Sequence, residues 1–158
     1  MPETPFSMGY RMPAEWEPHE GTWLSWPKNP GTFTPEHLPS VRKTYARVIN
    51  ELCTGERVHL LVDDARSQRE VIALAGQNRN LVFHTIPSAD VWVRDYGPIF
   101  VKNSDVAATK WTFNAWGGKY SDLLPDNETG SAIVDGAGTR AFETKVVLEG
   151  GSVDVNGR

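Results

Sequence analysis

Between residues 22 and 86 the sequence alternates short apolar runs with segments of helical periodicity. The apolar runs, each typical of a buried strand, are residues 22–26, 58–62 and 81–86. Ser40 is a natural N-cap, and apolar residues then recur at helical spacing up to Cys53, which predicts a first helix. A second helix is predicted from about Asp64 to Ala75, with Gly76 as its stop. Strands that alternate with helices in this way indicate βαβ units and a parallel sheet.

After residue 97 the pattern changes. Two β-rich runs, residues 98–102 and 106–112, are separated by the turn residues Asn103, Ser104 and Asp105, which predicts a hairpin. Residues 113–120 form a loop rich in Gly and Trp, residues 121–135 contain a helix, and residues 146–155 form a final strand. Because βαβ units are combined with a hairpin, we predict an α/β fold with mixed sheets.

The composition indicates a globular protein of one domain, with residues 1–12 as a loose arm. Apolar residues make up 39% of the 158 residues, and no apolar run approaches the roughly 20 residues that span a bilayer. A net charge of −4 argues against a nucleic-acid partner, since such surfaces are usually basic. A lone cysteine and the lack of a secretory signal make the cytoplasm the expected location.

The last residues indicate an unfinished hairpin. Asn156-Gly157 after an alternating strand is a strong signal for a two-residue turn, yet the sequence stops at Arg158 without a return strand. We therefore expect the chain to be truncated after Arg158, with a fold that is incomplete at the C-terminus.

Cys53 and the histidines do not form a recognisable catalytic or metal-binding pattern. Cys53 lies on the apolar stripe of the first helix, which favours a small buried side chain over a nucleophile. His59 and His84 fall inside predicted strands, and His19 lies in an irregular entry segment. There is no CxxC or HExxH spacing, so no metal is expected.

Two acidic clusters could carry chemistry. Residues 90–98 contain Asp90, Trp92, Arg94 and Asp95 beside a Gly-Pro break, where a carboxylate and a ring suit a flat cation. The alternative is an internal ion pair, between Arg94 and a carboxylate of the same loop, that only holds the loop. In residues 148–152 Glu149 precedes two glycines, which permits close approach of a ligand or backbone, or else forms an ordinary β-bulge.

Four motifs resemble the agmatine deiminases and their bacterial peptidyl-arginine deiminase relatives, and they stand in the order found in that family. They are RMPAEWEPH followed by TWLSWP (residues 11–27), WVRDYGP (92–98), FNAWGG (113–118) and LEGGS (148–152). The resemblance covers the chain from about Tyr10 to its end. It implies a partial pentein fold, an α/β propeller of ββαβ-type units around a central site.

The same resemblance implies a reaction without metal or organic cofactor. A cysteine thiolate attacks the guanidinium carbon, ammonia leaves with a proton from histidine, and water resolves the adduct. Asp95 matches the guanidinium-binding aspartate, Trp92 the aromatic beside the bound group, and Glu149 an acidic position of the site. The nucleophilic Cys and the His-x-Asp pair match nothing in residues 1–158, so the chain alone is predicted to be inactive.

Three interpretations remain open at this stage. The parent is a deiminase that converts agmatine to N-carbamoylputrescine for putrescine biosynthesis, or one that converts peptidyl arginine to citrulline. Alternatively, the Trp-rich loops belong to a non-catalytic module that binds a ligand such as a sugar. In the third interpretation, which is compatible with the deiminase one, the chain is an inactive piece that needs its remainder, or another chain, to complete the fold. A homo-oligomer is left open.

Overall fold

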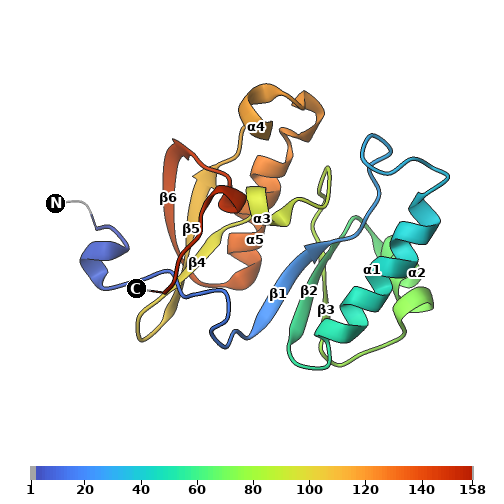
Figure 1. The fold of residues 1–158 in the computed structure, drawn as a ribbon, viewed down its shortest axis with the longest axis horizontal. Coiled ribbons are helices and arrows are strands. Elements are labelled where there is room, and N and C mark those ends of the chain that lie inside the picture. Colours follow the sequence, from blue (N-terminus) through green and yellow to red (C-terminus); the bar gives the residue numbers. More distant parts are fainter. Residues whose placement is uncertain (1–2, 158) are drawn as a thin grey trace. The chain divides into compact units, whose positions relative to one another are not determined.

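The computed structural model describes residues 3–157, and two parts of the chain each build a three-stranded sheet (Figure 1). One unit is His19–Val93, and the other joins residues 3–18 to residues 94–157. Across these described residues, no helix is both long and apolar enough to cross a membrane.

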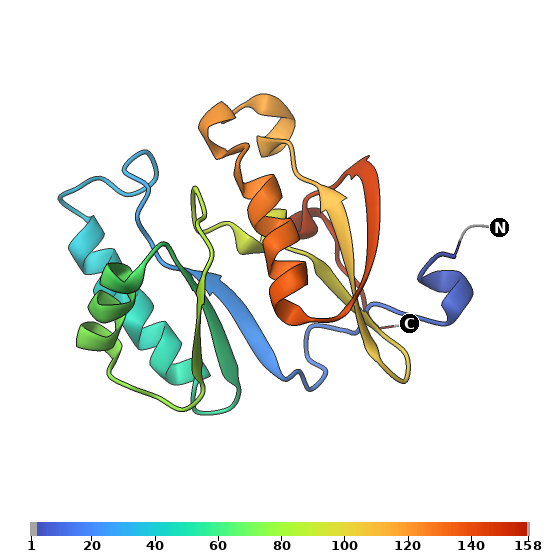
Figure 2. The ribbon, with the colours of Figure 1, turned by 180° about the vertical axis from the view of Figure 1, so that it is seen from behind.

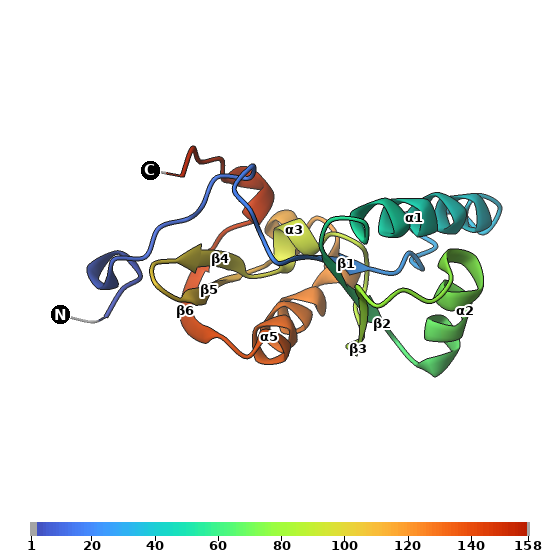
Figure 3. The same cartoon turned by 90° about the horizontal axis from the view of Figure 1, so that it is seen from below.

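The unit His19–Val93 is a parallel βαβαβ arrangement, as its sequence pattern predicts. Strands β1 (Gly21–Ser25), β2 (Arg57–Val62) and β3 (Leu81–Thr85) pair in the order β1-β2-β3, and both pairings are parallel. Helices α1 (Leu38–Leu52) and α2 (Ala65–Ala75) connect them. Figure 3 shows the two helices on one side of this sheet, where they cover its apolar face.

The core of this unit lies between that face and the helices. Side chains of β2 alternate, so that Val58, Leu60 and Val62 are buried against Ile49 of α1 and Val71 of α2. Burying such aliphatic side chains contributes roughly 1.5–3 kcal/mol each. The apolar residues at helical spacing and those that alternate along the strand thus pack together in one hydrophobic cluster.

The two helices differ in how well their starts were predicted. Asp64 caps α2, because its carboxylate accepts a hydrogen bond from the Ser67 N–H at 2.8 Å, and Gly76 ends the helix at φ 81°. For α1 the predicted N-cap is wrong: the helix begins at Leu38 after His37, and Ser40 lies inside it. Pro39 in the first turn supplies the alternative start, since proline needs no hydrogen-bond acceptor there.

The opposite face of this sheet carries a row of rings, one from each strand. The rings of Trp23 and His59 stack at 4.6 Å between centroids, and Trp23 lies 4.5 Å from His84. Nδ1 of His59 and Nε2 of His84 are hydrogen-bonded at 2.9 Å. Both histidines are therefore packed within the sheet, as their positions in strands predict.

The second unit combines the predicted hairpin with a parallel strand. Strands β4 (Ile99–Lys102) and β5 (Val106–Thr112) are antiparallel, and β6 (Arg140–Val147) pairs with β5 in parallel. Helix α5 (Asp126–Ala137), preceded by the 3-10 turn η2 (Ser121–Leu123), connects β5 to β6 and lies against this sheet (Figure 2). The predicted helix within residues 121–135 is thus confirmed.

The predicted final strand over residues 146–155 is wrong. The strand is β6, which begins at Arg140 and ends at Val147, and the 3-10 turn η3 (Gly150–Ser152) follows it. The reason is steric: a Cβ on Gly150 would lie 2.2 Å from the backbone oxygen of Arg94. Only glycine permits this close approach, so the chain turns here instead of continuing as a strand.

The loop between β5 and α5 contains a left-handed turn. In α4 (Ala115–Gly118) all four residues have positive φ, including Ala115 at 53° and Trp116 at 54°. Asn114 supports the turn, since its side chain accepts a hydrogen bond from the Gly117 N–H at 2.7 Å. Positive φ at two non-glycine residues carries strain of roughly 1–3 kcal/mol each.

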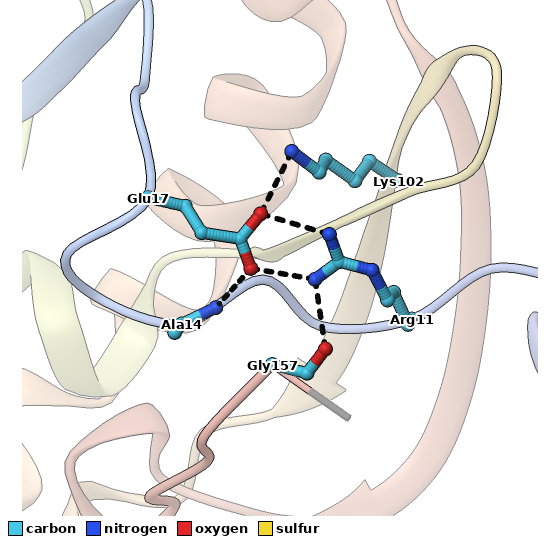
Figure 4. A network of polar contacts seen from close by, with 5 residues as sticks. All are labelled: Arg11, Ala14, Glu17, Lys102 and Gly157. Atoms are coloured by element: carbon cyan, nitrogen blue, oxygen red, sulfur yellow. Dashed lines mark hydrogen bonds and ion pairs between the residues drawn. The ribbon is translucent and has the colours of Figure 1, made fainter.

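An ion-pair cluster of Arg11, Glu17 and Lys102 joins three remote segments of the second unit (Figure 4). Glu17 accepts hydrogen bonds from both terminal nitrogens of Arg11, at 2.6 and 2.8 Å, and pairs with Lys102 at 2.9 Å. Arg11 also donates to the carbonyl of Gly157 at 3.0 Å. Arg11, the backbone N–H of Ala14 and Lys102 hold the pKa of Glu17 well below its usual range. The same cluster fixes residues 11–17 to the β4–β5 hairpin and to the last described residue.

Candidate functional site

Asp95 lies in α3 (Val93–Tyr96), a single helical turn that leads into β4. Its carboxylate is partly buried and accepts a hydrogen bond from the Gly151 N–H at 3.1 Å. Burial raises the pKa of Asp95 above its usual range; the charge of Glu149 adds to this, and Gly151 and Arg94 oppose it only in part. A cation that binds beside this carboxylate stabilises its charged form.

The two glycines of the LEGGS motif place Glu149 near Asp95. A Cβ on Gly151 would lie 2.4 Å from Oδ1 of Asp95, so a side chain at this position would displace the Asp95 carboxylate from its place against the turn η3. The two acidic side chains are thereby within electrostatic reach of each other. The structure thus brings together two of the three predicted site residues, and η3 is a close-approach turn rather than a β-bulge.

Arg94 supports this turn from the same unit. Its Nε donates to the carbonyl of Gly150 at 3.1 Å, and its Nη2 donates to Glu15 at 2.6 Å. Arg94 thus forms an ion pair, but with Glu15 and not, as the alternative from the sequence had it, with a carboxylate of its own loop. It leaves Asp95 with a different set of contacts, so the ion pair and a cation-binding role for Asp95 are compatible.

Trp92, the third predicted residue, belongs to the unit His19–Val93 and is described within it. Its side chain is 43% exposed, and its indole Nε1–H donates to Oδ2 of Asp90 at 3.2 Å. Asp90 itself is buried, with 1% exposure. Sequence reasoning placed Asp90 in an acidic cluster but gave it no role, because a buried carboxylate is recognised only from its partners.

Cys53 is a core residue, as the helical stripe predicts. It directly follows α1 and is only 3% exposed, and burial raises the pKa of its thiol. His19 pairs with Glu56 at 2.6 Å and lies in the unit that holds Cys53. Residues 3–157 contain no group of three His, Cys, Asp or Glu side chains that could hold a metal ion.

Comparison with known proteins gives consistent matches. The model of the Porphyromonas-type peptidyl-arginine deiminase family matches residues 11–158. The agmatine deiminase of Ectopseudomonas mendocina (strain ymp) is 37% identical over 161 residues, which cover 98% of this chain and 43% of that protein. The chain therefore spans less than half the length of this relative.

Solved structures agree with these sequence matches. The agmatine deiminase of Enterococcus faecalis has a TM-score of 0.88 at 29% identity, covering 99% of this chain and 44% of that one. The agmatine deiminase of C. jejuni has a TM-score of 0.77 at 26% identity, covering 94% and 44%. The mixed α/β arrangement is accordingly the corresponding part of the pentein fold. Since the family model matches nearly every residue, the chain belongs to the Porphyromonas-type peptidyl-arginine deiminase family.

Proposed function

We propose that the full-length protein is a guanidine deiminase that hydrolyses agmatine to N-carbamoylputrescine and ammonia, a step towards putrescine. The observation that carries this proposal is the pair of acidic side chains, Asp95 and Glu149, at a turn that two glycines permit. Two partly buried carboxylates repel each other, and a guanidinium placed beside them removes that cost while donating paired hydrogen bonds to them.

In this proposal Asp95 holds the guanidinium, Glu149 adds a second acidic contact, and Trp92 offers a ring face to the delocalised charge. The chemistry is attack of a thiolate on the guanidinium carbon, loss of ammonia, and hydrolysis of the adduct by water to the ureido product. Cys53 does not suit the attack, because its thiol is buried and its pKa is raised. The nucleophile and its histidine would come from the remainder of the parent chain.

Agmatine is the preferred substrate in this proposal because several relatives and solved structures that match nearly all of this chain carry that name. The family model instead carries the name of the peptidyl-arginine deiminases. A reducing compartment such as the cytoplasm would suit the free thiol of Cys53.

A substrate panel tests the proposal. Purified full-length protein is incubated with agmatine, free arginine and an arginine-containing peptide, and ammonia and ureido product are both quantified. We expect equimolar ammonia and N-carbamoylputrescine from agmatine. Turnover of the peptide alone would assign the protein to the peptidyl-arginine activity, and binding of agmatine without any product would favour a non-catalytic module.

A further inference from the structure

We propose that Asp90 is a positioning residue that fixes the orientation of the Trp92 ring and couples it to the loop that follows β1. This inference rests on the proposed function only in that Trp92 is taken to face the substrate. All of the contacts that carry it lie within the unit His19–Val93.

The carboxylate of Asp90 gathers donors from two separate segments. From its own segment it accepts the backbone N–H of Val91 at 2.8 Å on Oδ1 and the indole N–H of Trp92 at 3.2 Å on Oδ2. From the loop it accepts, also on Oδ2, the side-chain amide of Asn29 at 3.2 Å and the hydroxyl of Thr32. A buried carboxylate with this many donors remains in one geometry, because each lost contact would leave a buried charge unsatisfied.

The loop that provides Asn29 and Thr32 is itself attached to the helices and to β2. Arg42 of α1 donates from Nε to the carbonyl of Pro27 at 2.9 Å, and Lys28 forms an ion pair with Asp63 just beyond β2. The N–H of Gly31 closes a turn onto the side chain of Asn29 at 2.8 Å. The loop is therefore held in place by these contacts. Because Asp90 is hydrogen-bonded both to this loop and to Trp92, it also holds the indole ring in place.

Trp92 has the properties of a side chain that needs such support. The residue is 43% exposed, whereas its indole N–H donates to the carboxylate of Asp90, a residue with 1% exposure. A ring that stacks on a flat cation must present one face at a fixed angle. Holding the indole N–H fixes the ring plane before the ligand arrives, which lowers the entropic cost of binding.

The test is a double-mutant cycle in the full-length enzyme, with Asp90→Asn and Trp92→Phe. Asp90→Asn keeps the shape of the side chain but turns one acceptor into a donor that faces other donors. Trp92→Phe keeps a ring but removes the N–H. We expect each single variant to raise the KM for agmatine by roughly 10- to 100-fold, the scale of a hydrogen bond to a charged group. The kcat should change far less, because the ring contacts ground state and transition state alike.

The double variant distinguishes positioning from general stability. If Asp90 acts through Trp92, adding Asp90→Asn to Trp92→Phe should raise the KM by less than about threefold, since the contact is already lost. Glu36→Gln is the matched control: it removes the charge of an exposed carboxylate on the same loop that takes no part in the contacts of Asp90, and its KM should stay within about twofold of the wild type. Fully additive effects of Asp90→Asn and Trp92→Phe would overturn the proposal.

A spectroscopic measurement separates this inference from the proposed function. The indole N–H resonance of Trp92, identified by its loss in Trp92→Phe, should shift or broaden in Asp90→Asn, while the other indole resonances keep their positions. An unchanged Trp92 resonance would overturn the positioning role even if activity fell. Absence of agmatine turnover in the wild type would instead count against the proposed function and leave the resonance as the measure of Asp90.

Discussion

At the scale of single residues, Asp95 is a carboxylate in an environment that disfavours its ionised form. Burial and the neighbouring Glu149 raise the pKa of Asp95, so the free site holds its carboxylate at a cost that a bound guanidinium would relieve. Protonation of Asp95 would abolish this attraction. The KM for agmatine should therefore rise as the pH falls towards the raised pKa of Asp95, at a pH higher than for an ordinary aspartate. Steady-state kinetics between pH 4.5 and about 8 measures this.

The variant Asp95→Asn tests the same charge directly. It keeps the shape of the side chain and leaves a bound cation without its partner. We therefore expect kcat/KM for agmatine to fall, with a loss of roughly 2–5 kcal/mol in transition-state stabilisation. Asp105→Asn, in the exposed β4–β5 turn, is the matched control and should have no effect. An unchanged kcat/KM in Asp95→Asn would remove Asp95 from the site.

Cys53 is a potential nucleophile by its chemistry, but it lies in the core. Because its thiol packs in the core with Ile49 and Val58, Cys53→Ala should lower the free energy of unfolding by about 1 kcal/mol and leave full-length activity nearly intact. Urea denaturation and agmatine turnover measure the two effects. Rapid labelling of Cys53 by iodoacetamide in the folded protein, with loss of activity, would contradict its assignment to the core.

At the scale of elements, the turn η3 depends on glycine. Gly150→Ala places a methyl group 2.2 Å from the backbone oxygen of Arg94, so the turn must move and should take the contact between Gly151 and Asp95 with it. We expect a loss of roughly 1–3 kcal/mol in unfolding free energy, together with a lower kcat/KM. Gly55→Ala is the control, because a methyl group there meets nothing within 4 Å. Equal behaviour of the two variants would contradict the steric account.

The ring row on β1, β2 and β3 should make the unit His19–Val93 sensitive to pH. Burial lowers the pKa of His59 and of His84 below the unfolded value of about 6.5, with Arg57 and His59 respectively adding to the effect. The unfolded chain then binds more protons, so the free energy of unfolding should decrease as the pH falls below about 6.5. The loss should be complete below the lowered pKa values.

Urea denaturation between pH 8 and about 5 measures this dependence. His84→Asn removes one imidazole of the pair and should flatten the dependence. His37→Asn, outside the sheet, should leave it as in the wild type. A wild-type free energy of unfolding that is constant over this range would contradict the prediction.

These elements show what local pattern can and cannot predict. The strands β1, β2 and β3 and the helix α2 follow from periodicity, capping and stop residues, which act within a few positions of the chain. The end of β6 does not, because Gly150 is set by a close approach to Arg94, 56 residues away. The left-handed turn at residues 115–118 could not be predicted from the sequence either, because neither Ala115 nor Trp116 favours positive φ.

At the scale of the whole molecule, the residues of the proposed site are distributed over both units of the chain. Asp95 and Glu149 belong to one unit and Trp92 to the other, and the sequence motifs propose all three without describing their contacts. The support of Trp92 by Asp90, Asn29 and Thr32 joins residues about 60 positions apart, which no motif records. Resemblance thus predicts which residues to examine, and the structure supplies the partners that orient them.

The last prediction concerns the activity of residues 1–158 on their own. Deimination through a covalent adduct needs a nucleophile, a proton donor for the leaving ammonia, and acids that hold the cation. Of these, the chain offers only the acids. Its one cysteine is buried with a raised pKa, and His19, the histidine of the first motif, pairs with Glu56.

We therefore expect no ammonia release when purified residues 1–158 are incubated with agmatine, free arginine or an arginine peptide, while the full-length protein turns over agmatine. Because this chain covers only 43–45% of the agmatine deiminases that it matches, the remaining part of such a protein is large enough to supply the missing groups. Adding that remainder as a separate chain should restore some activity if the two parts associate. Turnover by residues 1–158 alone, unchanged in Asp95→Asn, would mean that a contaminant is responsible. Turnover that Asp95→Asn abolishes and Cys53→Ala also abolishes would make Cys53 the nucleophile and contradict its place in the core.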